Sequence, residues 1–121
     1  MRYCWTTLYV KNMVESLRFY QDVIGLQLNR ISKISPEFEL AFLGSGETQV
    51  ELIYDQSKEL DYTNSMISLG FQTESLEVLI EKLNQKGISV LAGPIQPNPS
   101  LRFFYILDPN GIKVQFIEFL K

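Results

Sequence analysis

The sequence contains no histidine and only one cysteine among its 121 residues. Without an imidazole there is no Ser-His-Asp triad, no Cys-His dyad and no histidine-built metal site, and a single thiol excludes a zinc knuckle. Cys4 also has no partner for an intramolecular disulfide, which fits a reducing compartment. Most familiar enzyme chemistry is therefore excluded before any motif is considered.

Positive charge and long apolar runs are also scarce. Eleven Lys and Arg stand against 14 Asp and Glu, for a net charge of -3, which disfavours nucleic acid and anionic membranes as partners. The longest apolar run, 103–107, is far short of the ~18 residues that a membrane span needs. With 45% apolar residues, we expect one compact cytoplasmic domain that binds neither nucleic acid nor membrane.

The first half of the chain predicts a strand, a helix and three further strands. Asn12 is a candidate N-cap with Glu15 three residues later, and Gly25 stands where a glycine ends many helices. Apolar residues recur between them at helical spacing. The predicted helix is 13–24, and the predicted strands are 3–11, 26–32, 38–43 and 48–54.

The second half repeats this order after a polar linker. A strand is expected at 65–71, then Thr73 as a possible cap, then a helix ended by Gly87. Asp108 and Gly111 bracket a sequence typical of a type I turn with a following bulge, a register that sets Tyr105 opposite Gln115. The predicted helix is 75–86, and a further strand is predicted to begin at Val90. The proline-containing segment 93–99 is predicted as a loop, and a hairpin is predicted at 102–119.

A self-alignment supports duplication. Residues 38–53 align with 102–117 without a gap, and residues 5–12 align with 66–73. The sequence therefore predicts an α+β fold of two tandem βαβββ modules whose helices cover one side of the sheets. We expect a single domain over 1–121, with module 1 at about 1–55, a linker at 56–63 and module 2 at about 64–121.

Strand alternation indicates which side chains face away from the helices. The uniformly apolar sets should lie under the helices, and the mixed sets should line a concave face. By the same alternation Cys4 is expected to be a buried, inert thiol, while Arg102 is expected to be solvated. The mixed sets place Trp5, Glu51, Met66 and Gln115 at corresponding positions of four strands, with Phe103 and Tyr105 facing the same cavity.

Three segments, LYVKNMVESLRFYQDVIGLQL, VELIY and RFFYILDPNGIKVQFIE, resemble the vicinal oxygen chelate superfamily. That superfamily includes glyoxalase I, bleomycin-resistance proteins and extradiol dioxygenases. The resemblance implies that the two modules form a cup-shaped mixed sheet, often around a divalent metal, and that the protein is a homodimer.

The resemblance also identifies the positions of the metal ligands, which glyoxalase-type members usually fill with His or Gln, Glu, His and Glu. These positions fall on Trp5, Glu51, Met66 and Gln115, so only Glu51 keeps the residue of the family. Tryptophan offers no metal-binding lone pair, a thioether is a soft ligand and a carboxamide is neutral. We therefore expect no metal and no cofactor.

Three functions remain open at this point. The first is a metal-free binding module, similar to the bleomycin-resistance branch, that holds a small aromatic or cationic molecule. The second is an enzyme that resembles glyoxalase I (a lactoylglutathione lyase) or another member such as a dioxygenase. The third is a metal-free enzyme with Glu51 as catalytic general base. The expected ligand-binding residues are Trp5, Glu51, Met66, Phe103, Tyr105 and Gln115.

Overall fold

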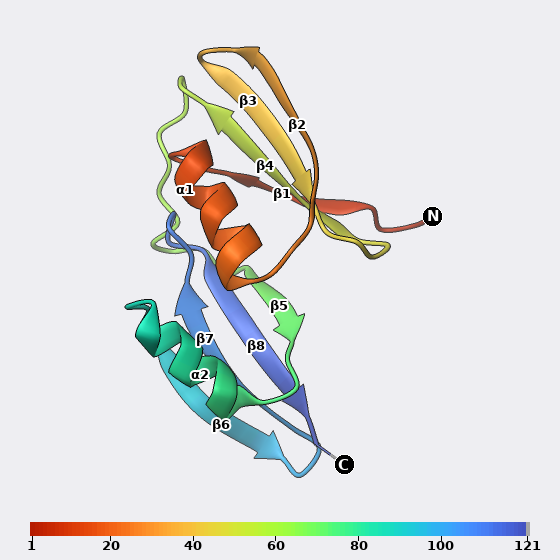
Figure 1. The fold of residues 1–121 in the computed structure, drawn as a ribbon, viewed down its shortest axis with the longest axis vertical. Helices are drawn as coiled ribbons and strands as arrows, with labels where there is room; N and C mark the ends of the chain where they lie inside the picture. Colours follow the sequence, from red (N-terminus) through yellow and green to blue (C-terminus); the bar gives the residue numbers. More distant parts are fainter. Residues whose placement is uncertain (121) are drawn as a thin grey trace. The chain divides into compact units, whose positions relative to one another are not determined.

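The computed structural model describes residues 1–120 and divides into two compact units, Met1–Asp61 and a second that begins at Tyr62 (Figure 1). The division falls inside the segment 56–63 that the sequence marks as a linker. Each unit contains a strand, a helical segment and three further strands, in that order. The predicted α+β fold with tandem βαβββ modules is confirmed.

Unit 1 has a four-stranded mixed sheet in the order β1-β4-β3-β2. β1 runs parallel to β4, and the other neighbours are antiparallel. Its elements are β1 (Trp5–Tyr9), α1 (Met13–Arg18), the π-helical turn η1 (Phe19–Val23), β2 (Leu28–Ser35), β3 (Phe38–Leu43) and β4 (Gln49–Asp55).

The helix of unit 1 begins as the sequence predicts. Asn12 is the N-cap, and its side-chain oxygen accepts a hydrogen bond from the Glu15 N–H at 2.9 Å. The second half is wider than an α-helix, because the Ile24 N–H donates to the Phe19 carbonyl five residues back. Gly25 then ends the helix with a φ of 89°, a conformation that glycine adopts readily.

Unit 2 repeats this sheet with the order β5-β8-β7-β6, and β5 runs parallel to β8. Its first strand begins three residues later than predicted, so Met66 precedes the strand. Its elements are β5 (Ser68–Gln72), α2 (Leu76–Gln85), β6 (Ala92–Asn98), β7 (Leu101–Leu107) and β8 (Lys113–Phe119).

The prediction of a loop at 93–99 is wrong, because most of this segment forms β6. The strand lies at the edge of the sheet and every residue in it is exposed. It pairs with β7 at only three positions, and Pro94 and Pro97 fall in the register shifts between them. An edge strand tolerates proline, because the missing N–H is not needed for a second neighbour.

Each helix covers one face of its own sheet, with α1 against β4 and α2 against β8 (Figure 1). The side chains beneath the helices form the core of each unit, as the strand alternation predicts. We call the other side the open face of each sheet. The buried apolar residues beneath the helices include Leu8, Val50, Leu52, Phe104, Val114 and Phe116.

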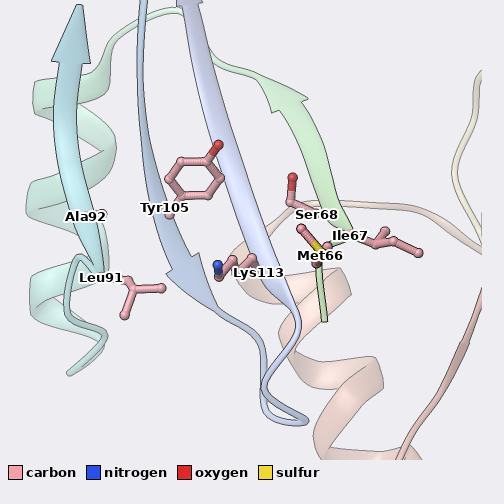
Figure 2. A pocket seen from close by; sticks show the side chains of 7 residues that line it. All are labelled: Met66, Ile67, Ser68, Leu91, Ala92, Tyr105 and Lys113. Atoms are coloured by element: carbon pink, nitrogen blue, oxygen red, sulfur yellow. The ribbon is translucent and has the colours of Figure 1, made fainter. Parts of the chain in front are cut away.

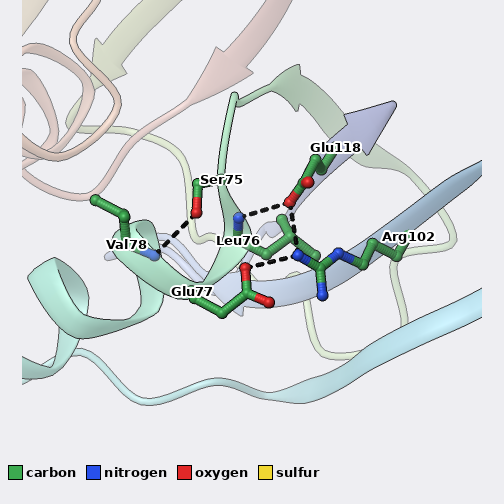
Figure 3. Close-up of polar contacts among 6 residues, drawn as sticks. All are labelled: Ser75, Leu76, Glu77, Val78, Arg102 and Glu118. Carbon is green, nitrogen blue, oxygen red and sulfur yellow. Dashed lines mark hydrogen bonds and ion pairs between the residues drawn. The ribbon is translucent and has the colours of Figure 1, made fainter. Parts of the chain in front are cut away.

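Arg102 is not simply solvated, contrary to the prediction. Its Nη2 donates to Glu77 at 2.6 Å and to Glu118 at 3.0 Å on the helix side of the sheet (Figure 3). Glu118 also accepts from the Leu76 N–H at 2.9 Å. The N-cap of α2 is Ser75 rather than Thr73. These contacts attach the first turn of α2 to β7 and β8.

Candidate functional site

The turn between β7 and β8 sets the register of the open face in unit 2. The Gly111 N–H donates to the Asp108 carbonyl at 3.1 Å, and Gly111 has a φ of 94°. The buried Asp108 carboxylate accepts from the N–H groups of Asn110 and Ile112, each at 2.8 Å. Tyr105 consequently pairs with Gln115, and this predicted register is confirmed.

Tyr105, Gln115 and Phe103 form a contiguous group on this open face. The Gln115 Nε2 donates to the Tyr105 hydroxyl at 3.2 Å, and the Phe103 and Tyr105 rings meet edge to face with centroids 5.7 Å apart. Gly70 lies opposite Gln115 on β5. The structure therefore brings together three of the six residues expected to bind a ligand.

A pocket of about 300 Å³ opens on this side of unit 2. Figure 2 shows the lining residues on β5, β6, β7, β8 and just before β5 and β6, with the Ile67 side chain pointing away from Tyr105 and Lys113. Tyr105 and Met66 line it, whereas Phe103 and Gln115 lie outside its lining and contact Tyr105. The lining residues are Met66, Ile67, Ser68, Leu91, Ala92, Tyr105 and Lys113.

Lys113 and Ser68 are the polar lining residues that sequence reasoning did not select. They face each other in the register of β5 and β8. The signal was available, because alternation places Lys113 on the same face as Gln115. Leu91 and Ala92 lie at the start of the strand predicted from Val90, but its pairing with β7 was not predicted, so nothing placed them beside Tyr105.

The open face of unit 1 holds the other two predicted residues that lie in strands. Glu51 is half-buried, and its Oε1 accepts from the Thr7 hydroxyl at 2.5 Å. Trp5 is 47% exposed and meets Phe42 edge to face, with centroids 5.1 Å apart. The Arg30 guanidinium lies over the Phe42 ring, 4.5 Å from its centroid. This face therefore carries a hydrogen-bonded carboxylate beside an aromatic pair.

Two placements that rested on strand alternation are wrong. Met66 was expected inside a strand, but it precedes β5 and is 99% exposed. Cys4 is an exposed free thiol, because it precedes β1 and is not held against the helix. The alternation rule failed at both positions, since it applies only inside a strand.

In the superfamily that the sequence resembles, four positions carry the metal ligands, and the residues at these positions here do not fit a divalent metal. Glu51 supplies the one carboxylate, and it is engaged with Thr7. The Gln115 amide is engaged with Tyr105, while Trp5 and Met66 offer an indole and a thioether, poor ligands for such an ion. Among residues 1–120, no three His, Cys, Asp or Glu side chains gather where they could hold a metal ion.

Comparison with known proteins identifies the family. A model of the Glyoxalase/Bleomycin resistance protein/Dioxygenase superfamily matches residues 2–116. The chain belongs to this superfamily. It is 34% identical to a lactoylglutathione lyase of Neisseria meningitidis over 98% of this chain and 91% of the relative. It is also 30% identical to the uncharacterized protein YwbC of Bacillus subtilis, over 93% of this chain and 94% of the relative.

Solved structures show the same fold. A glyoxalase family protein from Bacillus cereus matches with a TM-score of 0.86 at 19% identity, covering 100% of this chain and 95% of that one. An antibiotic binding protein from a Streptomyces species matches with a TM-score of 0.73 at 17% identity, covering 98% and 95%. No helix among residues 1–120 is long and apolar enough to cross a membrane.

Proposed function

We propose that this chain is a small-molecule-binding member of its superfamily that works without a metal, in the manner of the bleomycin-resistance branch. The pocket of unit 2 carries the proposal, because it combines an apolar wall with a few polar groups, as ligand sites usually do. Its volume of about 300 Å³ suits a small ligand. One solved protein of this fold is described as antibiotic binding.

The proposed ligand-binding residues fall into two groups. Tyr105 and Met66 line the pocket of unit 2, and Phe103 and Gln115 support the Tyr105 ring and hydroxyl. Trp5 and Glu51 present an indole and a carboxylate on the open face of unit 1. The residues at the four ligand positions support a function without a metal, since Glu51 supplies the one carboxylate among them.

The proposal is tested by metal analysis and by a ligand screen. Protein purified without chelators should carry well below one nickel, zinc or magnesium ion per chain. A fragment library screened by backbone amide NMR should return compounds that shift Ser68, Ala92 and Tyr105. Replacing Ala92 with Phe should fill the pocket and abolish those shifts while the remaining spectrum is kept. One tightly held metal per chain, or a screen with no response in the pocket, would overturn the proposal.

A second candidate is lactoylglutathione lyase activity, and the relatives of that name favour it. In this reading Glu51 is a catalytic base or a remaining ligand. The test is a lactoylglutathione lyase assay with and without added nickel or zinc, run beside Glu51→Gln. Activity that depends on metal and is lost in the variant would establish the second candidate and reject the first.

We also propose that the protein is a cytoplasmic homodimer. The outer strands β1 and β2 of one sheet and β5 of the other have free edges without proline within their units, and such edges invite pairing. Large apolar side chains are exposed beside β1 and β5, namely Tyr3, Trp5, Met66 and Ile67. Light scattering should give twice the chain mass of 14.0 kDa; a mass equal to that of one chain would reject the dimer.

A further inference from the structure

The charge in the unit 2 pocket indicates which ligands it accepts. Lys113 is the one charged side chain among the seven lining residues. Within residues 1–120, Lys113 is exposed and forms no ion pair. A free ammonium group in a chain of net charge -3 makes this pocket locally cationic. It therefore attracts an anion and repels a cation.

The neutral polar groups of the pocket also offer donors. Gln115 gives its amide hydrogen to the Tyr105 oxygen at 3.2 Å, which leaves the phenolic hydrogen free to donate elsewhere. The Gln115 Oε1 is turned toward Gly70, since a methyl group there would lie 3.6 Å from it. Ser68 adds a hydroxyl on the strand opposite Lys113. An ammonium and two hydroxyl donors together match an acceptor-only group such as a carboxylate.

The remaining lining is apolar and sets the shape of the ligand. Leu91 and Ala92 stand on one side of Tyr105, and Met66 and Ile67 precede the strand on the other side of Lys113 (Figure 2). At roughly 30 Å³ for each water-sized group, a cavity of about 300 Å³ holds on the order of ten non-hydrogen atoms. The occupant is thus a small molecule with one polar end and an apolar body.

We propose that the unit 2 pocket binds a small carboxylic acid as its anion, with the carboxylate at Lys113 and the apolar body against Leu91 and Ala92. The inference rests on the proposed function and specifies its ligand. The sequence predicted a small aromatic or cationic ligand, and this inference departs from the cationic alternative, for which Glu51 was the negatively charged group. That carboxylate lies on the sheet of unit 1 and does not line the pocket.

The test uses three probes of similar shape that differ in their polar group: benzoate, benzamide and benzylamine. Each is titrated into the full chain and followed by backbone amide shifts of Ser68, Ala92 and Lys113. Benzoate should bind at least about fivefold more tightly than benzamide, as expected for one solvent-accessible charge-assisted hydrogen bond. Benzylamine should not shift these amides, and added salt should weaken benzoate binding.

Variants assign the effect to Lys113. Lys113→Met, which keeps the length of the side chain, should reduce benzoate affinity about fivefold or more and leave benzamide unchanged, while Lys113→Arg should retain benzoate. Lys82→Met, on the exposed side of α2, is the matched control and should bind like the parent.

The possible failures are distinct. Equal binding of benzoate and benzamide, unaffected by Lys113→Met, would overturn the anion inference and leave the proposed small-molecule function standing. No response to benzoate in the pocket would also overturn the inference, and the unbiased fragment screen would then decide the proposed function separately.

Discussion

The Thr7 hydroxyl donates a hydrogen bond to the Glu51 carboxylate at 2.5 Å across the parallel pair β1 and β4. Glu51 is thereby held on the open face rather than left as an uncompensated charge among apolar neighbours. This contact separates two roles for Glu51, because a structural role depends on Thr7 whereas a binding role depends on a ligand.

Removing either partner of this hydrogen bond should lower stability. We expect Thr7→Val and Glu51→Gln each to reduce the free energy of unfolding by about 0.5–1.5 kcal/mol, since both groups keep access to water. The double variant should lose less than the sum. Urea unfolding of the four proteins measures this coupling. A higher free energy of unfolding for Glu51→Gln would show that the carboxylate destabilises the folded state.

Removing the turn carboxylate should have a larger effect. The buried Asp108 Oδ1 accepts from two backbone N–H groups, and both lose this partner in Asp108→Ala. We expect a loss of about 2–4 kcal/mol. Asp108→Asn should lose less, since its amide oxygen can still accept. Chemical denaturation compares the two, and equal losses would contradict the role given to the oxygen.

Two glycines with positive φ allow a matched comparison. At Gly93, with a φ of 104°, an added Cβ would meet the Phe103 carbonyl oxygen and the Phe104 Cβ at 3.0 Å. At Gly87, with a φ of 75°, nothing lies within 4 Å. Gly87→Ala should cost about 1 kcal/mol from backbone strain alone, and Gly93→Ala should cost more than about 2 kcal/mol. Similar melting temperatures for both variants would contradict the close approach of β6 to β7.

The pair of Glu77 and Arg102 should make stability depend on pH. The hydrogen bond from Arg102 lowers the pKa of Glu77 below its ordinary value of 4.5. The stabilisation is therefore complete well above pH 4.5 and is lost as the pH falls through the lower pKa of the folded state. The difference in unfolding free energy between the parent and Glu77→Gln should be constant near neutral pH and shrink in acid. In an Arg102→Met background this pH dependence should become clearly smaller, because the hydrogen bond from Arg102 is the largest cause of the lowered pKa of Glu77.

Most of the fold could be predicted from the sequence because local signals and the repeat agreed. Asn12 and the Asp108 turn are local features whose geometry follows from their own side chains, and the turn fixed Tyr105 opposite Gln115. A strand was predicted to begin at Val90, but its continuation through 93–98 was not, since Pro94 and Pro97 are unfavourable in most strands and only the edge position of β6 admits them.

The candidate site was less predictable for a related reason. Tyr105 followed from strand register, but Lys113 became prominent only when the pocket lining was known. The partners of Arg102 also required the tertiary structure, because Glu77 and Glu118 lie 25 and 16 residues away in the sequence. Strand alternation shows which face a side chain occupies, but it does not show which neighbours share a cavity.

The prolines of β6 also affect how unit 2 meets other chains. A strand that adds to a sheet edge needs a regular series of N–H donors, and Pro94 and Pro97 each remove one from β6. The irregular pairing with β7 further prevents a flat edge. This side of the sheet is therefore a poor template for fibril growth, and any second copy that extends the sheet of unit 2 must do so beside β5.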